Sequence, residues 1–186
     1  MFVFERSDDT LIKQALKGRQ GAWDKLVTRY QKPIYHYALR MVSNQDDALD
    51  LMQDIFISVY RNLASFRGES PFKGWLFKIA HYRCIEFYRK KKPTLSLDEA
   101  PNLDDRDDGH CSVQVMYDNQ QAQMLYQAMQ SLPVNQKLVI EMKFFQQFTF
   151  DEIAQQLGVS TNTIKSRAYS ALDKLKITLE VDYEAG

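Results

Sequence analysis

Cysteine, glycine and proline are all scarce in this chain. Its 186 residues include 2 cysteines, 7 glycines and 5 prolines. Cys84 and Cys111 have no CxxC partner and no metal-ligand spacing, so we expect two free thiols and no metal site. Few helix breakers, and no sustained alternation of apolar and polar residues, predict an all-α fold.

Long apolar runs are also missing. No segment approaches the roughly 20 consecutive apolar residues of a membrane-spanning helix, and the first residues do not resemble a signal peptide, so we expect a cytoplasmic protein. His36, His81 and His110 are isolated from one another and from the cysteines. With no phosphate-binding loop or nucleophile arrangement either, we expect no enzyme activity and no cofactor.

The net charge is zero, but the charges are unevenly distributed. Residues 1–97 hold 17 Lys+Arg against 10 Asp+Glu. Residues 98–120 hold 1 basic against 7 acidic residues, and residues 121–186 hold 6 against 7. Because salt screens charges beyond roughly 8–10 Å, a phosphate responds to the local balance. The sequence therefore predicts three pieces: a domain over residues 1–93, a flexible acidic linker over 94–120, and a second domain over 121–186.

Apolar periodicity and caps predict the helices of both domains. Ser7 and Asn44 are expected N-caps, and Pro33 is expected to kink or break the second helix near Lys32 because proline removes a backbone donor. The last residues, 180–186, are expected to form a frayed tail. Helices are predicted over about 8–17, 21–42, 44–66, 71–92, 121–132 and 133–145, followed by a helix pair over 148–175.

The segment FTFDEIAQQLGVSTNTIKSRAYSALDKL, residues 148–175, predicts a helix-turn-helix. Gly158 allows positive φ in the turn, Ser160 or Thr161 caps the second helix, and small Ala154 permits a close helix approach. The expected inner stripe of the second helix is Val159, Ile164, Ala168, Leu172 and Leu175. Polar and basic residues lie outward or flank this stripe and can reach base edges and phosphates: Thr161, Asn162, Lys165, Ser166, Arg167 and Tyr169. An ordinary helical hairpin with a solvated polar face is the alternative.

Two further patterns lie in the first domain. Residues 65–92 interleave aromatic with basic side chains, which suits opened or single-stranded DNA, although a buried aromatic core with solvated lysines is the competing interpretation. The outer face of the third helix is acidic and polar, with Asp46, Asp50, Gln53, Asp54 and Arg61. By itself, such a face is either solvated or a protein-docking surface.

The segment from Asp50 to Lys92 is followed by the dipeptide Leu132-Pro133 and then by the helix-turn-helix. This series resembles bacterial RNA polymerase sigma factors of the extracytoplasmic-function (ECF) branch. The resemblance covers about residues 8–93 and 121–178. It implies that Leu49, Asp50, Gln53 and Asp54 dock on the polymerase clamp. It implies minus-ten recognition and strand opening by Phe66, Arg67, Phe72, Trp75, Lys78, His81, Tyr82 and Arg83. It implies minus-thirty-five recognition by Ser160, Thr161, Asn162, Lys165, Ser166, Arg167, Tyr169 and Ser170.

The resemblance also implies partners and a role. The partners would be core RNA polymerase, promoter DNA as duplex and as opened strand, and an anti-sigma factor; the role would be promoter-specific initiation for a stress or envelope response. The alternatives are a stand-alone helix-turn-helix transcriptional regulator that binds closed duplex, and an interaction module that reads no DNA. The aromatic and basic segment favours the sigma factor, because a duplex-only regulator has no use for it.

Overall fold

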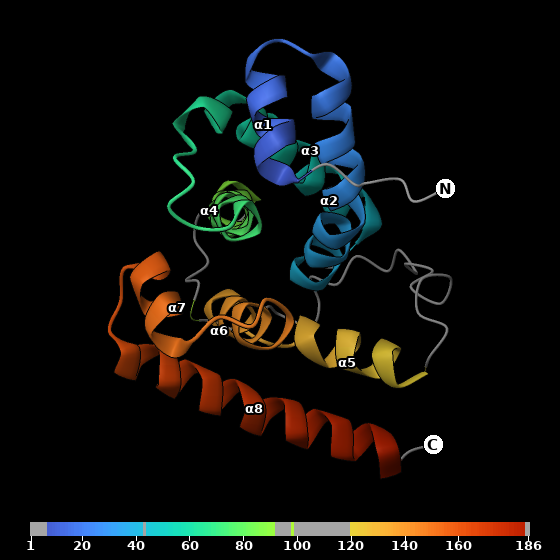
Figure 1. The fold of residues 1–186 in the computed structure, drawn as a ribbon. Coiled ribbons are helices and arrows are strands. Elements are labelled where there is room, and N and C mark those ends of the chain that lie inside the picture. Colours follow the sequence, from blue (N-terminus) through green and yellow to red (C-terminus); the bar gives the residue numbers. More distant parts are fainter. Residues whose placement is uncertain (1–6, 43, 92–97, 99–119, 185–186) are drawn as a thin grey trace, which may run out of the picture.

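The computed structural model describes residues 7–42, 44–91, 98 and 120–184, and all regular structure within these residues is helical (Figure 1). The predicted all-α class is therefore confirmed. The helices are α1 (Asp8–Leu16), α2 (Gln20–Met41), α3 (Gln45–Asn62), α4 (Phe72–Lys91), α5 (Gln120–Gln130), α6 (Val134–Ile140), α7 (Phe150–Leu157) and α8 (Thr161–Glu184), with short segments η1 (Leu63–Ser65) and η4 (Glu141–Phe145, π-helical).

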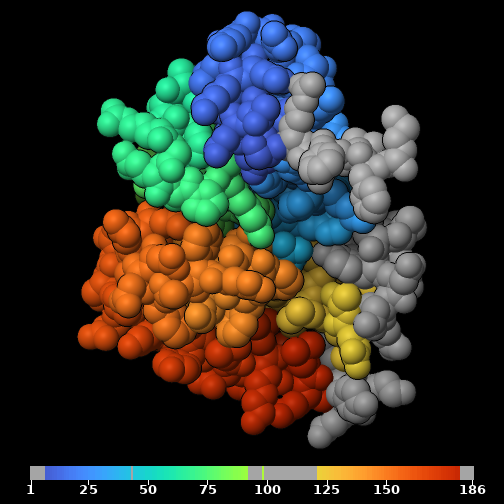
Figure 2. All heavy atoms as spheres, in the orientation of Figure 1, coloured from blue at the N-terminus to red at the C-terminus, as the bar shows by residue number. Residues whose placement is uncertain are grey.

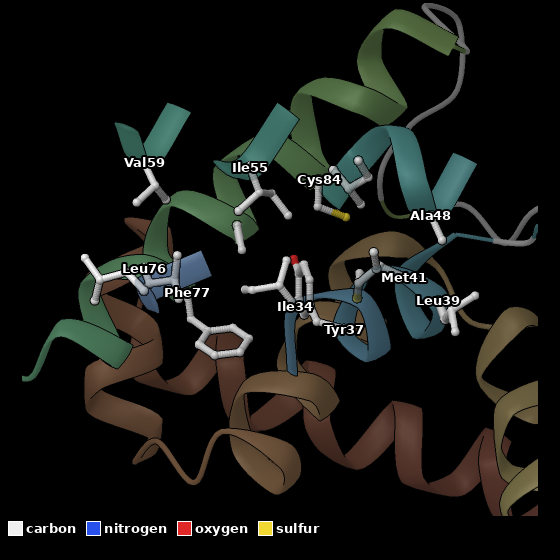
Figure 3. Packing of buried hydrophobic residues seen from close by; sticks show 14 of the residues in the cluster. Ile34, Tyr37, Leu39, Met41, Ala48, Ile55, Val59, Leu76, Phe77 and Cys84 are labelled. Atoms are coloured by element: carbon white, nitrogen blue, oxygen red, sulfur yellow. The ribbon is translucent and has the colours of Figure 1, made fainter. Parts of the chain in front are cut away.

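Helices α1 to α4 pack around one apolar core. Figure 3 shows Ile34 and Tyr37 of α2 facing Ile55 of α3 and Phe77 of α4, and all four side chains are fully buried. Burying a large apolar side chain contributes about 1.5–3 kcal/mol. This core fixes the orientation of α3 and α4, whose outer faces carry predicted functional residues.

The ends of these helices follow local sequence signals. The Ser7 hydroxyl accepts from Thr10 N, and Asn44 Oδ1 accepts from Asp47 N at 2.8 Å, so both predicted caps are confirmed. The sequence predicted a kink or a break near Lys32. The break does not occur, because α2 continues through Pro33 to Met41, and the kink stays a prediction. Pro33 itself is exposed while neighbouring Ile34 is buried in the core, so packing holds the helix through a residue that weakens its backbone.

Helices α7 and α8 form the predicted helix-turn-helix. Thr149 and Glu152 make a reciprocal capping box at the start of α7, which satisfies two backbone donors. Gly158 has φ +68° in the turn, and Ser160 accepts from Thr163 N at 3.1 Å at the start of α8. The choice between Ser160 and Thr161 as N-cap is thereby resolved in favour of Ser160.

Two details of α8 differ from the sequence prediction. Leu172 is exposed and Ala171 is fully buried instead, because α8 turns its small residues towards α5 and α6. The helix also continues to Glu184, so most of the predicted frayed tail is helical.

Gly158 is expected to be a sensitive position. Gly158→Ala should lower the free energy of unfolding by about 1–2 kcal/mol, since a Cβ strains the left-handed backbone. Gly21→Ala is the matched control, because a Cβ at Gly21 meets nothing within 4 Å and the backbone has no positive φ. It should leave stability unchanged or slightly raised. Urea unfolding measures both variants, and equal effects would contradict the assigned turn.

The two helical groups are in direct contact. In Figure 1, α5 to α8 lie below α1 to α4, and in Figure 2 the two groups meet along a broad front. Tyr126, Val134 and Leu138 of the second group join the core of the first. The predicted flexible linker lies outside the described residues except for Asp98 and for Gln120, which begins α5. The Asp98 carboxylate accepts from Asn135 at 2.8 Å.

Candidate nucleic-acid interface

One face of α8 presents four of the predicted DNA-contacting residues together. Asn162, Lys165, Ser166 and Tyr169 are all exposed, and Tyr169 retains 61% of its surface. Their spacing of three, four and seven residues places them on one side of a helix. The face combines a cation, two short polar groups and an aromatic ring, which is the chemistry that contacts phosphates, base edges and thymine methyl groups.

The other four predicted residues of the helix-turn-helix make internal contacts. The Thr161 hydroxyl donates to Asp151 at 2.7 Å, which joins the two helices of the motif, and Ser160 caps α8. Half-buried Arg167 lies 3.4 Å from the Asp98 carboxylate, and Ser170 accepts from Gln136 at 3.1 Å. In this conformation these four residues therefore support the recognition helix through internal contacts. The exposed face itself is formed by Asn162, Lys165, Ser166 and Tyr169.

Three aromatic side chains support the predicted minus-ten loop. The ring centroids of Phe66, Phe72 and Trp75 lie 5.4–5.7 Å apart, within the range of favourable aromatic pairs. Phe72 is buried, while Phe66 and Trp75 are half-buried. These three rings hold both ends of the loop over residues 66–71. The Arg67 side chain of this loop is exposed.

Helix α4 extends this surface with two exposed side chains one turn apart. Lys78 is exposed, and Tyr82 retains 64% of its surface. Half-buried Arg83 forms an ion pair with Glu86 at 2.5 Å. A cation beside an exposed ring is suited to an unpaired nucleotide, whose phosphate and base it can contact together.

His81 requires a correction. It is 2% exposed, its Nδ1 lies 3.1 Å from the Tyr37 hydroxyl, and its ring is therefore out of reach of DNA in this conformation. Its expected contact with the opened strand was implied by the resemblance to sigma factors. The four-residue spacing from Phe77, a core residue, is the signal that would have placed His81 in the core.

Burial of His81 is expected to make stability pH-dependent. Desolvation lowers its pKa from 6.5 to about 3. The folded state keeps it neutral while the unfolded state binds a proton below pH 6.5, so stability falls as pH drops from 6.5 towards 3. Between pH 7 and 5 the loss from this residue should be about 2 kcal/mol.

Urea unfolding of His81→Gln at both pH values tests this expectation. The variant should lose less stability between pH 7 and 5 than the native chain does. His36→Gln is the comparison variant, because it removes a histidine that is half-buried and not part of the core, and whose pKa burial also lowers. An unchanged pH dependence in His81→Gln would contradict the assignment.

The predicted docking residues share the outer face of α3. Leu49, Asp50, Gln53 and Asp54 are all exposed. The same stripe continues through exposed Ile57 and Tyr60, which the sequence analysis did not identify. Their helical spacing from Gln53 was the available signal. The result is an acidic and apolar strip on a helix whose opposite face is held in the core.

Within the described ranges, no group of three or more His, Cys, Asp or Glu residues could hold a metal ion. No helix in that part of the chain is long and apolar enough to span a membrane. Cys84 is a free, buried thiol, and burial raises its pKa to about 12, so it is unreactive at neutral pH. Cys111 lies outside the described residues.

The chain matches two family models in order. Residues 26–94 match Sigma-70 region 2, and residues 122–175 match Sigma-70, region 4. The first match contains α3, the aromatic loop and α4, and the second contains the helix-turn-helix. Both candidate DNA surfaces thus lie within the matched regions.

Whole-chain relatives agree with these matches. The sigma factor SigV of Bacillus subtilis is 31% identical over 82% of this chain and 88% of its own length. The ECF sigma factor SigW of the same species is 30% identical over 89% of this chain and 92% of its own, and the ECF sigma-E factor of Escherichia coli is 27% identical over 91% and 92%.

Two solved structures share the fold. CnrH, bound to the cytosolic domain of CnrY, has a TM-score of 0.63 over 95% of this chain and 99% of its own, at 23% identity. RpoE of Bartonella quintana, bound to the anti-sigma factor NepR, has a TM-score of 0.62 over 86% and 97%, also at 23% identity. Two sigma regions in order, and relatives at 30% identity or more over most of their length, show that the chain belongs to the ECF family of RNA polymerase sigma factors.

Proposed function

We propose that this chain binds core RNA polymerase and directs it to specific promoters for transcription initiation. The observation that carries the proposal is the presence of three chemically different exposed faces on one chain. α3 presents an acidic and apolar strip, α4 presents exposed aromatic and basic side chains, and α8 presents a polar and basic face. A protein that only binds duplex DNA needs the third face alone.

The α8 face is proposed to bind the minus-thirty-five element as closed duplex. The second helix of a helix-turn-helix enters the major groove with its N-terminal residues next to the bases. Asn162, Lys165 and Ser166 lie in the first two turns of α8 and are exposed. Tyr169 lies one turn further along, where its ring can contact a thymine methyl group.

The loop over residues 66–71 and α4 are proposed to hold the opened minus-ten element. Extruding a base costs a few kcal/mol, and stacking and pocket contacts offset this cost. Phe66 and Trp75 offer half-buried rings held by Phe72, while Lys78 and Tyr82 continue the surface along α4. The chain would thus capture the melted strand without any covalent step.

The acidic α3 strip is proposed to dock on a basic coiled coil of the polymerase clamp. Complementary charge speeds association and fixes orientation. The second half alone should bind DNA weakly, because residues 121–186 carry 6 basic against 7 acidic residues. Docking both halves on one polymerase raises their effective concentration at the promoter.

These assignments divide the chain into functional parts. Residues 1–93 would dock the clamp and open the strand, residues 94–120 would link the halves, and residues 121–186 would bind the upstream element. A protein with this role acts without enzyme activity and in the cytoplasm, where the polymerase is. We further propose that an anti-sigma factor restrains it until a stress or envelope signal arrives.

Run-off transcription with core polymerase and a promoter library tests the proposed function. Adding the chain should produce transcripts from a defined subset of promoters that core polymerase alone does not use. DNA binding that is independent of polymerase, without new transcripts, would instead identify a stand-alone regulator. Polymerase binding without transcripts would identify an interaction module.

Lys165→Ala is expected to weaken binding to the upstream element. The loss of one phosphate contact should reduce the slope of log affinity against log salt by about 1. Lys174→Ala is the matched control, because Lys174 is also exposed on α8 but lies beyond the recognition face. Equal salt slopes for both variants and the native complex would remove Lys165 from the interface.

A further inference from the structure

The first turn of α8 uses its hydroxyl groups in contacts within the protein. Ser160 Oγ accepts from the backbone nitrogen of Thr163 at 3.1 Å and lies 2.8 Å from the Thr163 hydroxyl oxygen. The Thr161 hydroxyl donates to Asp151 Oδ1 at 2.7 Å. Every hydroxyl-bearing side chain of residues 160–163 is therefore engaged before DNA is bound.

Asn162 differs from its neighbours in this turn. Its side chain is exposed, and its amide makes no hydrogen bond within the part of the chain that the structure describes. Asparagine is favoured at the start of a helix chiefly as an N-cap, but Ser160 already caps α8. The Asn162 amide therefore keeps two N–H donors and one carbonyl acceptor available to a ligand.

The hydrogen bond between Thr161 and Asp151 fixes the place of this amide. Asp151 lies in the first turn of α7, and Thr161 is the first residue of α8, so the bond joins the starts of the two helices. In Figure 1, α7 lies over the first part of α8. Asn162 directly follows Thr161 and so lies on a turn that is held at two points, by the Ser160 cap and by Asp151.

This turn is the part of a helix-turn-helix that meets the bases. The N-terminal residues of the second helix lie next to base edges in the major groove. Asn162 is the second residue of α8, and exposed Lys165, Ser166 and Tyr169 continue the same face along the helix. An amide at this place is therefore positioned for contact with a base edge.

The hydrogen-bonding pattern of an amide selects one base. In the major groove adenine presents the N6 donor beside the N7 acceptor, and asparagine matches both, because its oxygen accepts from N6 and its nitrogen donates to N7. Guanine presents two acceptors, O6 and N7, and leaves the amide oxygen without a donor. A good bidentate contact discriminates against the wrong base by roughly 5–150-fold.

We propose that Asn162 is a specificity-determining residue that reads an adenine in the upstream promoter element, and that Asp151 is a positioning residue that acts on it through Thr161. This inference rests on the proposed function, because it assigns one base of the element that α8 binds. The Thr161 hydroxyl, which the resemblance placed among the DNA contacts, serves to join α7 and α8 instead.

Selection from a library with a randomised upstream element tests the base assignment, using the full chain bound to core polymerase. The native chain should enrich adenine at one position of the element. Asn162→Ala should reduce that preference by about tenfold and leave the preferences at the other positions intact. Alanine is the best helix former, so the loss would not come from unfolding of α8.

An isosteric variant tests the hydrogen-bonding pattern itself. Asn162→Asp keeps the shape of the side chain but has no donor for adenine N7, so the adenine preference should disappear. Because a carboxylate accepts from cytosine N4, cytosine should be enriched at that position instead. Gln31→Ala is the control, since it removes an exposed amide from α2, outside the helix-turn-helix, and should change no base preference.

The positioning role of Asp151 has its own variants. Asp151→Ala removes the acceptor for Thr161 and should weaken the adenine preference by about threefold. Asp151→Asn retains an Oδ1 acceptor and should preserve the preference, while Thr161→Val removes the hydroxyl and should reproduce the effect of Asp151→Ala. Loss of charge repulsion alone would raise the affinity for all sequences in both Asp151 variants and would leave the base preference unchanged.

An adenine preference that persists in Asn162→Ala would overturn the base assignment and would attribute the preference to DNA shape. Equal preferences in Asp151→Ala, Asp151→Asn and the native chain would remove the positioning role. If the native chain on polymerase enriches no upstream sequence, the proposed function itself fails. An enriched element whose bases do not respond to Asn162 leaves that function intact and overturns only this inference.

Discussion

Replacing Asp50 with arginine is expected to lower the affinity for core RNA polymerase by roughly 10–100-fold, or about 1.4–2.8 kcal/mol. Asp50 is exposed on the outer face of α3, between Leu49 and the turn that carries Gln53 and Asp54. The substitution changes the local charge by two units in the middle of the acidic strip. Like charges placed opposite one another at an interface cost several kcal/mol, and the remaining contacts offset part of this.

The fold should survive this change, since Asp50 lies on the face of α3 opposite the buried Leu51 and Ile55. Asp24→Arg makes the same change in charge at an exposed position of α2, outside the proposed docking strip. It should retain native affinity within about twofold. If Asp50→Arg and Asp24→Arg bind core polymerase equally well, the docking strip is assigned to the wrong face.

Tyr82→Ala is expected to reduce promoter opening by about tenfold, while the amount of polymerase bound to the chain stays unchanged. Stacking of one base on an aromatic ring contributes about 1–3 kcal/mol. Tyr82 retains 64% of its surface in the structure, so removing its ring costs little in stability. Its exposed position beside Lys78 on α4 makes it the aromatic side chain that is most accessible to an opened strand.

Tyr82→Phe separates stacking from hydrogen bonding by the hydroxyl. The phenylalanine variant should open the promoter as the native chain does, because the π-face is retained. The measurement is the fraction of promoter in open complex at a fixed polymerase concentration. Native levels of open complex in Tyr82→Ala would exclude stacking on this residue, and equal losses in both variants would assign its contribution to the hydroxyl.

Local signals made much of the fold predictable from sequence. Ser7, Asn44 and Gly158 determine helix ends through contacts within a few residues, and the structure places all three as expected. Where tertiary packing overrides a local signal, the sequence prediction fails. The helix does not break at Pro33, because adjacent Ile34 is anchored in the core.

The candidate site was predictable to the extent that its residues are exposed and share a helical face. Asn162, Lys165, Ser166 and Tyr169 meet both conditions. His81 does not, because the role implied by the resemblance does not specify which side of α4 the residue occupies. Its four-residue spacing from Phe77 puts both side chains on the buried face of α4.

The ion pair between the two helical groups could not be predicted from the sequence. Arg40 and Glu141 are 101 residues apart, and neither lies in a motif. Each has an ordinary charged side chain in an amphipathic helix, for which exposure is the usual expectation. Only the structure shows that the two side chains pair, with Arg40 Nε 2.6 Å from a Glu141 carboxylate oxygen, and so join the two helical groups.

Permanganate reactivity of thymines in a promoter found by run-off transcription tests the central claim most directly. Unpaired thymines react, whereas those in duplex DNA are protected. The proposed function requires new reactive thymines near position −10 when the chain, core polymerase and promoter are combined, and none when either protein is omitted. Protection that persists in the complete mixture, or reactivity without the chain, would contradict a sigma factor that opens promoter DNA.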